Sequence, residues 1–66
     1  MTFREYLIEV GKMQKGTGWR YGQTLFNVLY IYRPGLACDV RGTEYDPYYK
    51  SDGNTDGFFY WLQARW

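Results

Sequence analysis

Apolar and polar positions follow a helical spacing from the start of the chain. Apolar side chains recur every three or four residues from Phe3, and charged side chains fall between them. Thr2 and Glu5 stand three residues apart just before this pattern, in the arrangement of a helix capping box. The pattern predicts a helix over about residues 2–14. Its apolar face would consist of Phe3, Tyr6, Leu7, Val10 and Met13.

A second helix follows a glycine-containing loop at residues 15–18, where two glycines supply the backbone freedom for a chain reversal. This helix is expected to begin between residues 17 and 20 and to run to about Tyr32. Its apolar face would carry Tyr21, Leu25, Val28, Leu29 and Tyr32, with Phe26 beside it.

Pro34 ends the second helix, because the residue before a proline avoids helical backbone angles. Proline also suits the first turn of a following helix. We therefore expect a short third helix over residues 35–41, with Gly42 as its left-handed terminator.

The last part of the chain is a polar loop followed by an aromatic segment at residues 58–66. Phe58, Trp61 and Leu62 have helical spacing, whereas Phe58, Tyr60 and Leu62 alternate as in a strand. We favour a helix, because no second strand-like segment offers a pairing partner. The sequence thus predicts an all-α fold, a single domain of residues 1–66 with three to four short helices. The expected core is Phe3, Leu7, Val10, Leu25, Val28, Leu29, Leu36, Val40, Phe58 and Leu62.

Composition excludes the commonest supports of a small fold. Cys38 is the only cysteine and there is no histidine, so neither an internal disulfide nor a zinc site can form. No metal or other cofactor is predicted. Cys38 lies in an apolar run and is expected to be buried. Charged residues interrupt the first ten positions, which argues against a secretory signal peptide. No stretch reaches the ~20 apolar residues of a membrane span. We expect a soluble, cytoplasmic protein.

Aromatic residues are unusually frequent: three Trp, eight Tyr and four Phe among 66 residues. A core this small cannot enclose fifteen large rings, so several must lie at the surface. Clustered exposed rings mark interfaces, although tyrosines can also simply cover the edges of a small core. A homodimer that buries the surplus rings is a further possibility.

Polar residues on the apolar second helix are candidates for a recognition face. Gln23 and Asn27 are four residues apart and share one side of the helix, with Trp19 and Arg20 at its start. The alternative is that these amides bond backbone groups within the fold.

Arg41 and Asp46 flank the turn at Gly42 and are close enough in sequence to form an ion pair. The alternative is that Arg41 binds a partner's carboxylate or a phosphate. The set of predicted partner-binding residues is Trp19, Arg20, Gln23, Asn27, Arg41, Tyr48, Tyr49 and Trp66.

Asp52, Asn54 and Asp56, followed by Gly57, match the first half of an EF-hand calcium loop. The twelfth position is Gln63, which lacks the bidentate carboxylate that completes such a site. The favoured interpretation is a polar loop in which Asp56 caps the last helix, and weak calcium binding stays open.

One run of residues resembles a group of short phage and bacterial proteins of no established activity. It comprises Tyr21-Gly22-Gln23-Thr24, Phe26-Asn27, Pro34, Leu36-Ala37, Val40-Arg41-Gly42-Thr43 and Asp46-Pro47-Tyr48-Tyr49. The resemblance covers nearly the whole chain, and Tyr48 is a mild departure from it, since Phe is expected at this position. It implies a small phage-type protein that acts on a host component, and it assigns no functional residues.

Function classes can be ordered from these observations. A net charge of +1 and a short, weakly basic third helix argue against a dedicated nucleic-acid binder. With no histidine and little room for a cleft, we expect no enzyme. The favoured function is therefore binding of a protein partner, possibly a host protein, through exposed aromatic residues. A nucleic-acid-binding accessory module is the alternative, with phosphate contacts from Lys12, Lys15, Arg20 and Arg33.

Overall fold

The first helix begins and ends at recognisable caps. In the structure, a computed structural model that describes residues 1–50 and 54–66, α1 spans Phe3–Thr17. Thr2 and Glu5 form the predicted capping box, with hydrogen bonds of 3.1 and 2.8 Å between their side chains and backbone N–H groups. The helix continues three residues beyond the predicted end, because Gly18 rather than Gly16 adopts the left-handed conformation (φ 71°).

The second and third helices meet at a single residue. α2 spans Tyr21–Tyr32 and α3 spans Pro34–Val40, and Arg33 separates them. Pro34 occupies the first turn of α3, and Gly42 has a positive φ of 75°, both as predicted. α2 begins after Arg20, at the late end of the predicted range.

The aromatic segment at the end of the chain is helical. α4 spans Asp56–Arg65, which confirms the prediction of a helix over a strand. Thr55 is its N-cap and makes no side-chain capping bond. The prediction that Asp56 caps this helix is wrong, because Asp56 is already within the first turn, where its charge faces the positive end of the helix dipole.

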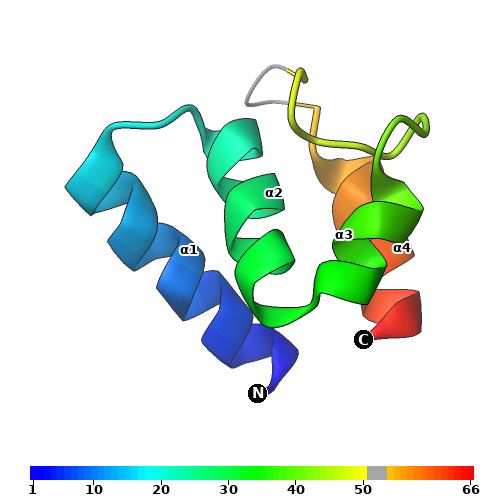
Figure 1. The fold of residues 1–66 in the computed structure, drawn as a ribbon, viewed down its shortest axis with the longest axis horizontal. Helices are drawn as coiled ribbons and strands as arrows, with labels where there is room; N and C mark the ends of the chain where they lie inside the picture. The colour runs from blue at the N-terminus through cyan, green and yellow to red at the C-terminus, as the bar shows by residue number, and fades with distance from the viewer. Residues whose placement is uncertain (51–53) are drawn as a thin grey trace.

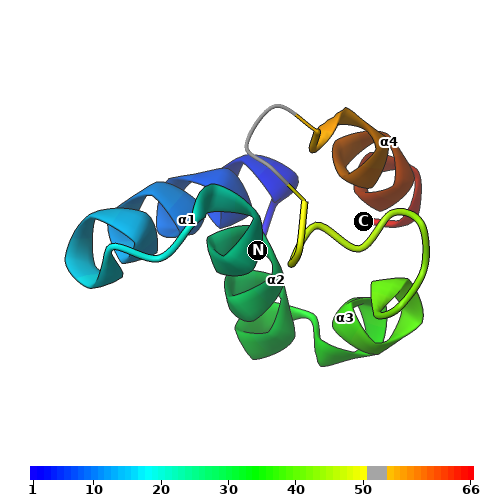
Figure 2. The same cartoon turned by 90° about the horizontal axis from the view of Figure 1, so that it is seen from above.

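The described part of the chain is all-α, as predicted, and helix α2 lies at its centre (Figure 1). It packs between α1 on one side and α3 on the other. Seen from above, the loop after α3 returns towards the start of α2 before the chain enters α4 (Figure 2). The radius of gyration is 10.7 Å, close to the ~11 Å of a folded chain of this length.

The core contains most of the predicted residues, with one exchange on α1. Leu25, Val28, Leu29, Val40, Phe58 and Leu62 are all fully buried. Leu7, predicted to be in the core, is 37% exposed, and its neighbour Tyr6 is fully buried instead. The Tyr6 hydroxyl donates a 2.7 Å hydrogen bond to the backbone carbonyl of Leu25, which satisfies its polar end inside the core.

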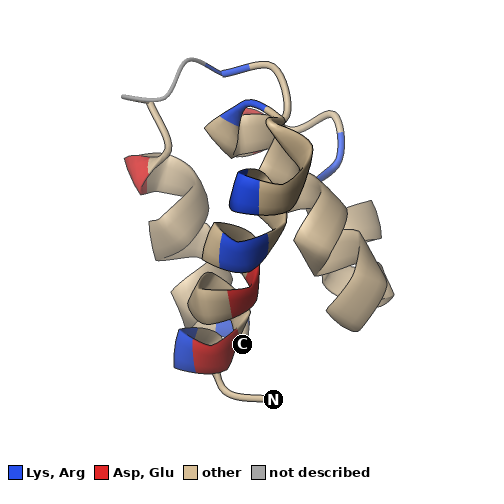
Figure 3. Ribbon diagram, turned by 90° about the vertical axis from the view of Figure 1, so that its left-hand side faces the viewer, with Lys and Arg blue, Asp and Glu red and all other residues tan. Residues whose placement is uncertain are grey.

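The surface carries several large rings and an uneven distribution of charge. Five tyrosines are exposed: Tyr30, Tyr32, Tyr45, Tyr49 and Tyr60. Charged residues lie on α1, α3 and α4 and in the loops, whereas α2 carries none (Figure 3). Cys38 is exposed, so its predicted burial is wrong, because Ala37 and Val40 form the inward face of α3. Among the described residues, no helix has the length and apolar character to cross a membrane.

Candidate functional site

The loop that follows α3 is ordered by the side chain of Asp46. Its two carboxylate oxygens accept hydrogen bonds from the backbone N–H groups of Gly42 at 2.9 Å and Tyr48 at 3.0 Å. Thr43 adds a second local clamp, since its hydroxyl donates to the Val40 carbonyl at 2.7 Å and accepts from the Tyr45 N–H at 3.2 Å. These bonds fix the backbone on both sides of the turn and so set the direction of Tyr48.

The same loop is docked on the start of α2. Pro47 is buried, and its carbonyl lies directly against Gly22, where no Cβ would fit. Arg20 donates a 2.9 Å hydrogen bond to the carbonyl of Tyr48, and the Gln23 amide donates to the Tyr48 hydroxyl at 3.4 Å. The docking therefore explains two residues in the first turn of α2: Gly22 leaves space for the Pro47 carbonyl, and Gln23 bonds the Tyr48 hydroxyl.

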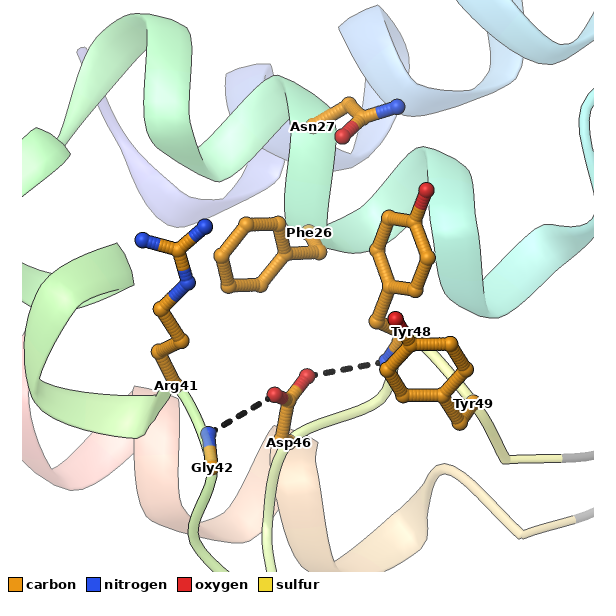
Figure 4. A pocket seen from close by; sticks show the side chains of 7 residues that line it. All are labelled: Phe26, Asn27, Arg41, Gly42, Asp46, Tyr48 and Tyr49. Carbon is orange, nitrogen blue, oxygen red and sulfur yellow. Dashed lines mark hydrogen bonds between the residues drawn. The ribbon is translucent and has the colours of Figure 1, made fainter.

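A pocket of about 420 Å³ lies between α2, the end of α3 and this loop. We call it the tyrosine pocket. Its lining residues are Phe26, Asn27, Arg41, Gly42, Asp46, Tyr48 and Tyr49. Figure 4 shows the Phe26 ring between the Arg41 side chain and the Tyr48 ring, with the Asp46 carboxylate pointing into the same space. The pocket thus combines an aromatic surface with one cation and one anion.

Arg41 and Asp46 do not form the predicted ion pair. Within residues 1–50 and 54–66 the ion pair is Lys12–Glu9, at 3.4 Å on the surface. The Asp46 carboxylate is held by two backbone N–H groups, which fix it inside the turn. The guanidinium of Arg41 lies 6.0 Å from the centre of the Phe26 ring, at the rim of the pocket. Its donors therefore remain available to an acceptor from outside.

The aromatic rings of the pocket form a chain of edge-on contacts. Phe26 and Tyr48 pack with ring centres 5.8 Å apart at 86°, and Tyr48 and Tyr49 at 4.8 Å and 65°. Tyr49 ends this chain and is 85% exposed. A large ring held against a rigid neighbour, but left in water, loses little conformational entropy when a partner covers it.

The structure brings six of the eight predicted residues together. Asn27, Arg41, Tyr48 and Tyr49 line the pocket, and Arg20 and Gln23 bind Tyr48 from behind. The Gln23 amide therefore bonds a group within the fold, but that group is a side-chain hydroxyl and not the backbone group of the alternative interpretation. Trp19 is half-buried in the link between α1 and α2, where its backbone N–H donates to the Thr17 hydroxyl at 3.2 Å.

Trp66 lies away from the pocket and is engaged within the fold. Its indole N–H donates to the Met1 carbonyl at 3.1 Å, and Arg33 donates to the same carbonyl at 3.0 Å. The Arg33 guanidinium also sits 4.6 Å from the centre of the Trp66 ring, which packs against Phe3 and Tyr6. This cluster joins the start of the chain and of α1 to the end of the chain after α4, so Trp66 is not part of the surface around the tyrosine pocket.

Residues 51–53 lie outside the described residues, and the proposed calcium ligand Asp52 is among them. The described part of the chain contains no cluster of three or more metal-ligating residues. Asn54 and Asp56, the other two positions of the motif, lie just before and at the start of α4.

Sequence reasoning missed three contributors to this face of the molecule. Phe26 forms the aromatic floor of the pocket, although the sequence places it beside the apolar face of α2. Tyr30 and Ile31 are more than half exposed at the end of the same helix. The absence of any charged residue between positions 21 and 32 is a signal that could have drawn attention to all three.

Comparisons with known proteins return no relative of this chain. No protein-family model matches it, and neither a curated protein nor a solved structure shows significant similarity.

Proposed function

We propose that this protein is a non-enzymatic binding module that engages a partner protein through the tyrosine pocket and the adjoining face of α2. The observation that carries the proposal is that α2 has no charged residue in twelve positions and still exposes Tyr30 and Ile31. A charge-free helix is expected at the centre of a fold or at the centre of an interface. One side of α2 lies at the centre of the fold, and its exposed side would lie at the centre of an interface when a partner covers it.

The exposed side of α2 is a narrow stripe next to the pocket. At 100° per residue, Gln23, Asn27, Tyr30 and Ile31 fall within about 100° of one another around the helix axis. We call these four residues the outer stripe. Buried Thr24 and Phe26 border it on its two sides. Asn27 belongs to both the stripe and the pocket lining, so the two features form one continuous surface.

The composition of this surface matches that of protein interfaces. Tyrosine and arginine are enriched in interface centres, and lysine and glutamate are depleted. Tyr49 supplies an exposed aromatic anchor, and Arg41 at the pocket rim can meet a carboxylate of the partner in a two-pronged hydrogen bond. Gln23 and Asn27 supply amide groups that bond peptide backbone without adding charge.

The partner we propose is a host protein in the host cytoplasm, whose surface the module occupies and thereby modulates. Support for this narrower statement is the resemblance to short phage proteins in the Tyr21–Thr24, Arg41–Thr43 and Asp46–Tyr49 runs. Binding would modulate the partner by covering its surface and not by a chemical reaction.

The experiment that tests this proposal compares two matched isoleucine variants. Ile31, in the outer stripe, is 56% exposed, and Ile8, on the outward face of α1, is 50% exposed. Tagged wild-type protein, Ile31→Lys and Ile8→Lys are used to capture partners from nuclease-treated bacterial lysate, and the captured proteins are identified by mass spectrometry. We expect a stoichiometric partner that Ile31→Lys loses and Ile8→Lys retains, because a buried lysine without a counter-ion opposes binding.

Tyr49→Ala is the second arm of this experiment. It removes the exposed anchor and should lower capture by about tenfold or more, as truncation of an interface hot spot does. Capture that both isoleucine variants lose equally, or that Tyr49→Ala leaves intact, would contradict the proposal. Capture that disappears with nuclease and falls steeply with salt would instead favour the nucleic-acid alternative. Three of the four cations considered for that alternative already make contacts within the protein: Lys12 with Glu9, Arg20 with Tyr48, and Arg33 with Met1 and Trp66.

A further inference from the structure

A second hollow lies on α4, and the tyrosine pocket shares no residue with it. It has a volume of about 340 Å³ and is mainly apolar. We call it the α4 trough. Its lining residues are Tyr45, Gly57, Tyr60, Trp61, Ala64 and Arg65. Five come from α4, and Tyr45 comes from the loop after α3.

The trough has a floor of alternating small and large residues. Gly57, Trp61 and Ala64 stand four and three positions apart, so they lie along one face of α4. A Cβ on Gly57 would lie 3.5 Å from the Tyr45 ring, which shows that the loop ring borders the helix at its first turn. Tyr60 projects from the same region and is 82% exposed. Two tyrosine rings from different segments therefore border one short apolar depression.

The polar side-chain atoms of the trough are predominantly hydrogen-bond donors. Within the described residues no buried side-chain nitrogen or oxygen lacks a partner, so the Trp61 indole N–H, which has no protein acceptor, is not fully enclosed, although Trp61 as a whole is only 9% exposed. The Arg65 guanidinium stacks 4.4 Å from the centre of the Trp61 ring and donates one bond to the Trp61 carbonyl at 3.0 Å. The other N–H groups of Arg65 and the hydroxyl of Tyr60 remain available to donate hydrogen bonds to a ligand. A hydrogen bond between the Glu44 carboxylate and the Tyr45 hydroxyl raises the pKa of that phenol.

A ligand that fits this lining needs flat apolar rings and carbonyl acceptors but few N–H donors. Proline has no backbone N–H, and in a polyproline II helix its carbonyls point outward without internal partners. Aromatic-lined grooves bind such segments because the helix is already formed before binding. A peptide of ordinary residues would bring backbone N–H groups to a surface that offers them few acceptors.

The length of the trough agrees with one turn of such a helix. From Gly57 to Ala64, α4 rises about 10 Å. Three residues of polyproline II rise about 9 Å, which is one complete turn. We propose that the α4 trough binds a proline-rich segment of a partner protein, in the polyproline II conformation, with its rings against Tyr60 and Trp61 and its carbonyls facing the Trp61 and Arg65 donors.

The proposal is tested with a capped ten-residue proline peptide and isotope-labelled protein. The indole N–H resonance of Trp61 is followed by NMR as the peptide is added, together with those of Trp19 and Trp66. We expect a saturable shift of the Trp61 resonance that exceeds those of the other two. A soluble alanine-based peptide of equal length should shift it about tenfold less at the same concentration.

Two tyrosine variants complete the test. Tyr60→Ala should weaken proline-peptide binding by about tenfold or more, because it removes one of the bordering rings. Tyr49→Ala, an equally exposed tyrosine at the other pocket, should leave the affinity within about twofold. Both side chains are exposed, so both variants retain the fold, which the dispersion of the amide spectrum verifies. No saturable Trp61 shift, equal binding of the alanine peptide, or equal losses in both variants would overturn the proposal. The lysate capture by Ile31→Lys and Ile8→Lys is independent of this result, so each proposal can fail without the other.

Discussion

Gly22 lies directly against the backbone carbonyl of Pro47, with no space for a side chain between the two. This contact joins the first turn of α2 to the loop that carries Tyr48 and Tyr49. Because the opposing atom belongs to the backbone of a proline, it cannot move aside as the end of a flexible side chain would.

Gly22→Ala should therefore destabilise the protein, because forcing a group into a packed site costs about 1–3 kcal/mol. Against a backbone carbonyl we expect the upper part of that range, which leaves a net loss of about 1–2 kcal/mol after the ~1 kcal/mol that alanine gains over glycine in a helix. Gly11→Ala is the matched control, because Gly11 is also helical but has open space around it, and it should stabilise by about 0.5–1 kcal/mol. Urea unfolding of both variants measures the change in the free energy of unfolding. A Gly22→Ala variant that is more stable than the wild type would contradict the close contact between Gly22 and Pro47.

Tyr6 makes the stability of the fold sensitive to alkaline pH. Burial raises the pKa of its phenol above the ordinary value of about 10, so the folded protein holds the proton that the unfolded chain releases. This contribution is complete below pH 10 and is lost as the pH rises beyond it. Tyr6→Phe should cost about 1 kcal/mol at neutral pH, through the lost bond to Leu25, and should flatten the fall in stability above pH 10. Thermal melts between pH 8 and 11 would show whether the melting temperatures of the wild type and of Tyr6→Phe converge as the pH rises.

Asp46 should be the residue whose loss most disturbs the loop. Its carboxylate is the common acceptor for the N–H groups of Gly42 and Tyr48, and Asp46→Ala removes both bonds. We expect a loss of about 1–2 kcal/mol, below the sum for two charged hydrogen bonds because the site is half-exposed. Hydrogen exchange at the Gly42 and Tyr48 amides should accelerate, while the amides of α1 keep their rates. Unchanged exchange at those two amides would show that Asp46 does not hold the loop.

Glu5 should make the stability of α1 depend on acid. The hydrogen bond from the Thr2 backbone N–H lowers the pKa of this carboxyl below its ordinary value. Its contribution is present above that ordinary value and is lost as the pH falls through the lowered one. Glu5→Gln keeps an acceptor for the capping box, so it should match the wild type near pH 3 and differ from it near pH 7. The test is the melting temperature of both proteins between pH 3 and pH 7. If the difference between the wild type and Glu5→Gln is the same at every pH, the Glu5 charge has no role in the stability.

The sequence predicted the helices because their signals are local. The capping box at Thr2, the proline at position 34 and the apolar spacing along α1 and α2 each act within a few residues. The choice of Tyr6 over Leu7 for the core could not be predicted in this way. It depends on a hydrogen bond to Leu25, on another helix, that no local pattern contains.

The candidate site was predicted in composition but not in arrangement. Asn27, Arg41, Tyr48 and Tyr49 were identified from residue type and spacing, and the structure places them around one pocket. Opposite charges across a turn suggested an ion pair between Arg41 and Asp46, but the short aspartate side chain reaches the nearby backbone N–H groups instead. The docking of the loop on Gly22 and Arg20 is a contact between distant segments, which spacing alone does not reveal.

The placement of Tyr48 and Tyr49 on a docked loop also has a consequence for folding kinetics. The contacts that hold this loop, from Arg20 and Gln23 to Tyr48, close a segment of more than twenty residues, whereas α1 and α2 are neighbours joined by a short link. Closing the longer segment costs more chain entropy, so the α1–α2 pair forms early and the loop docks after the rate-limiting step. Substitutions at Arg20 or Asp46 should then accelerate unfolding and leave the folding rate nearly unchanged. The loop that carries Tyr48 and Tyr49, part of the proposed binding surface, should thus be assembled last and released first, while the pair of helices beneath it remains formed.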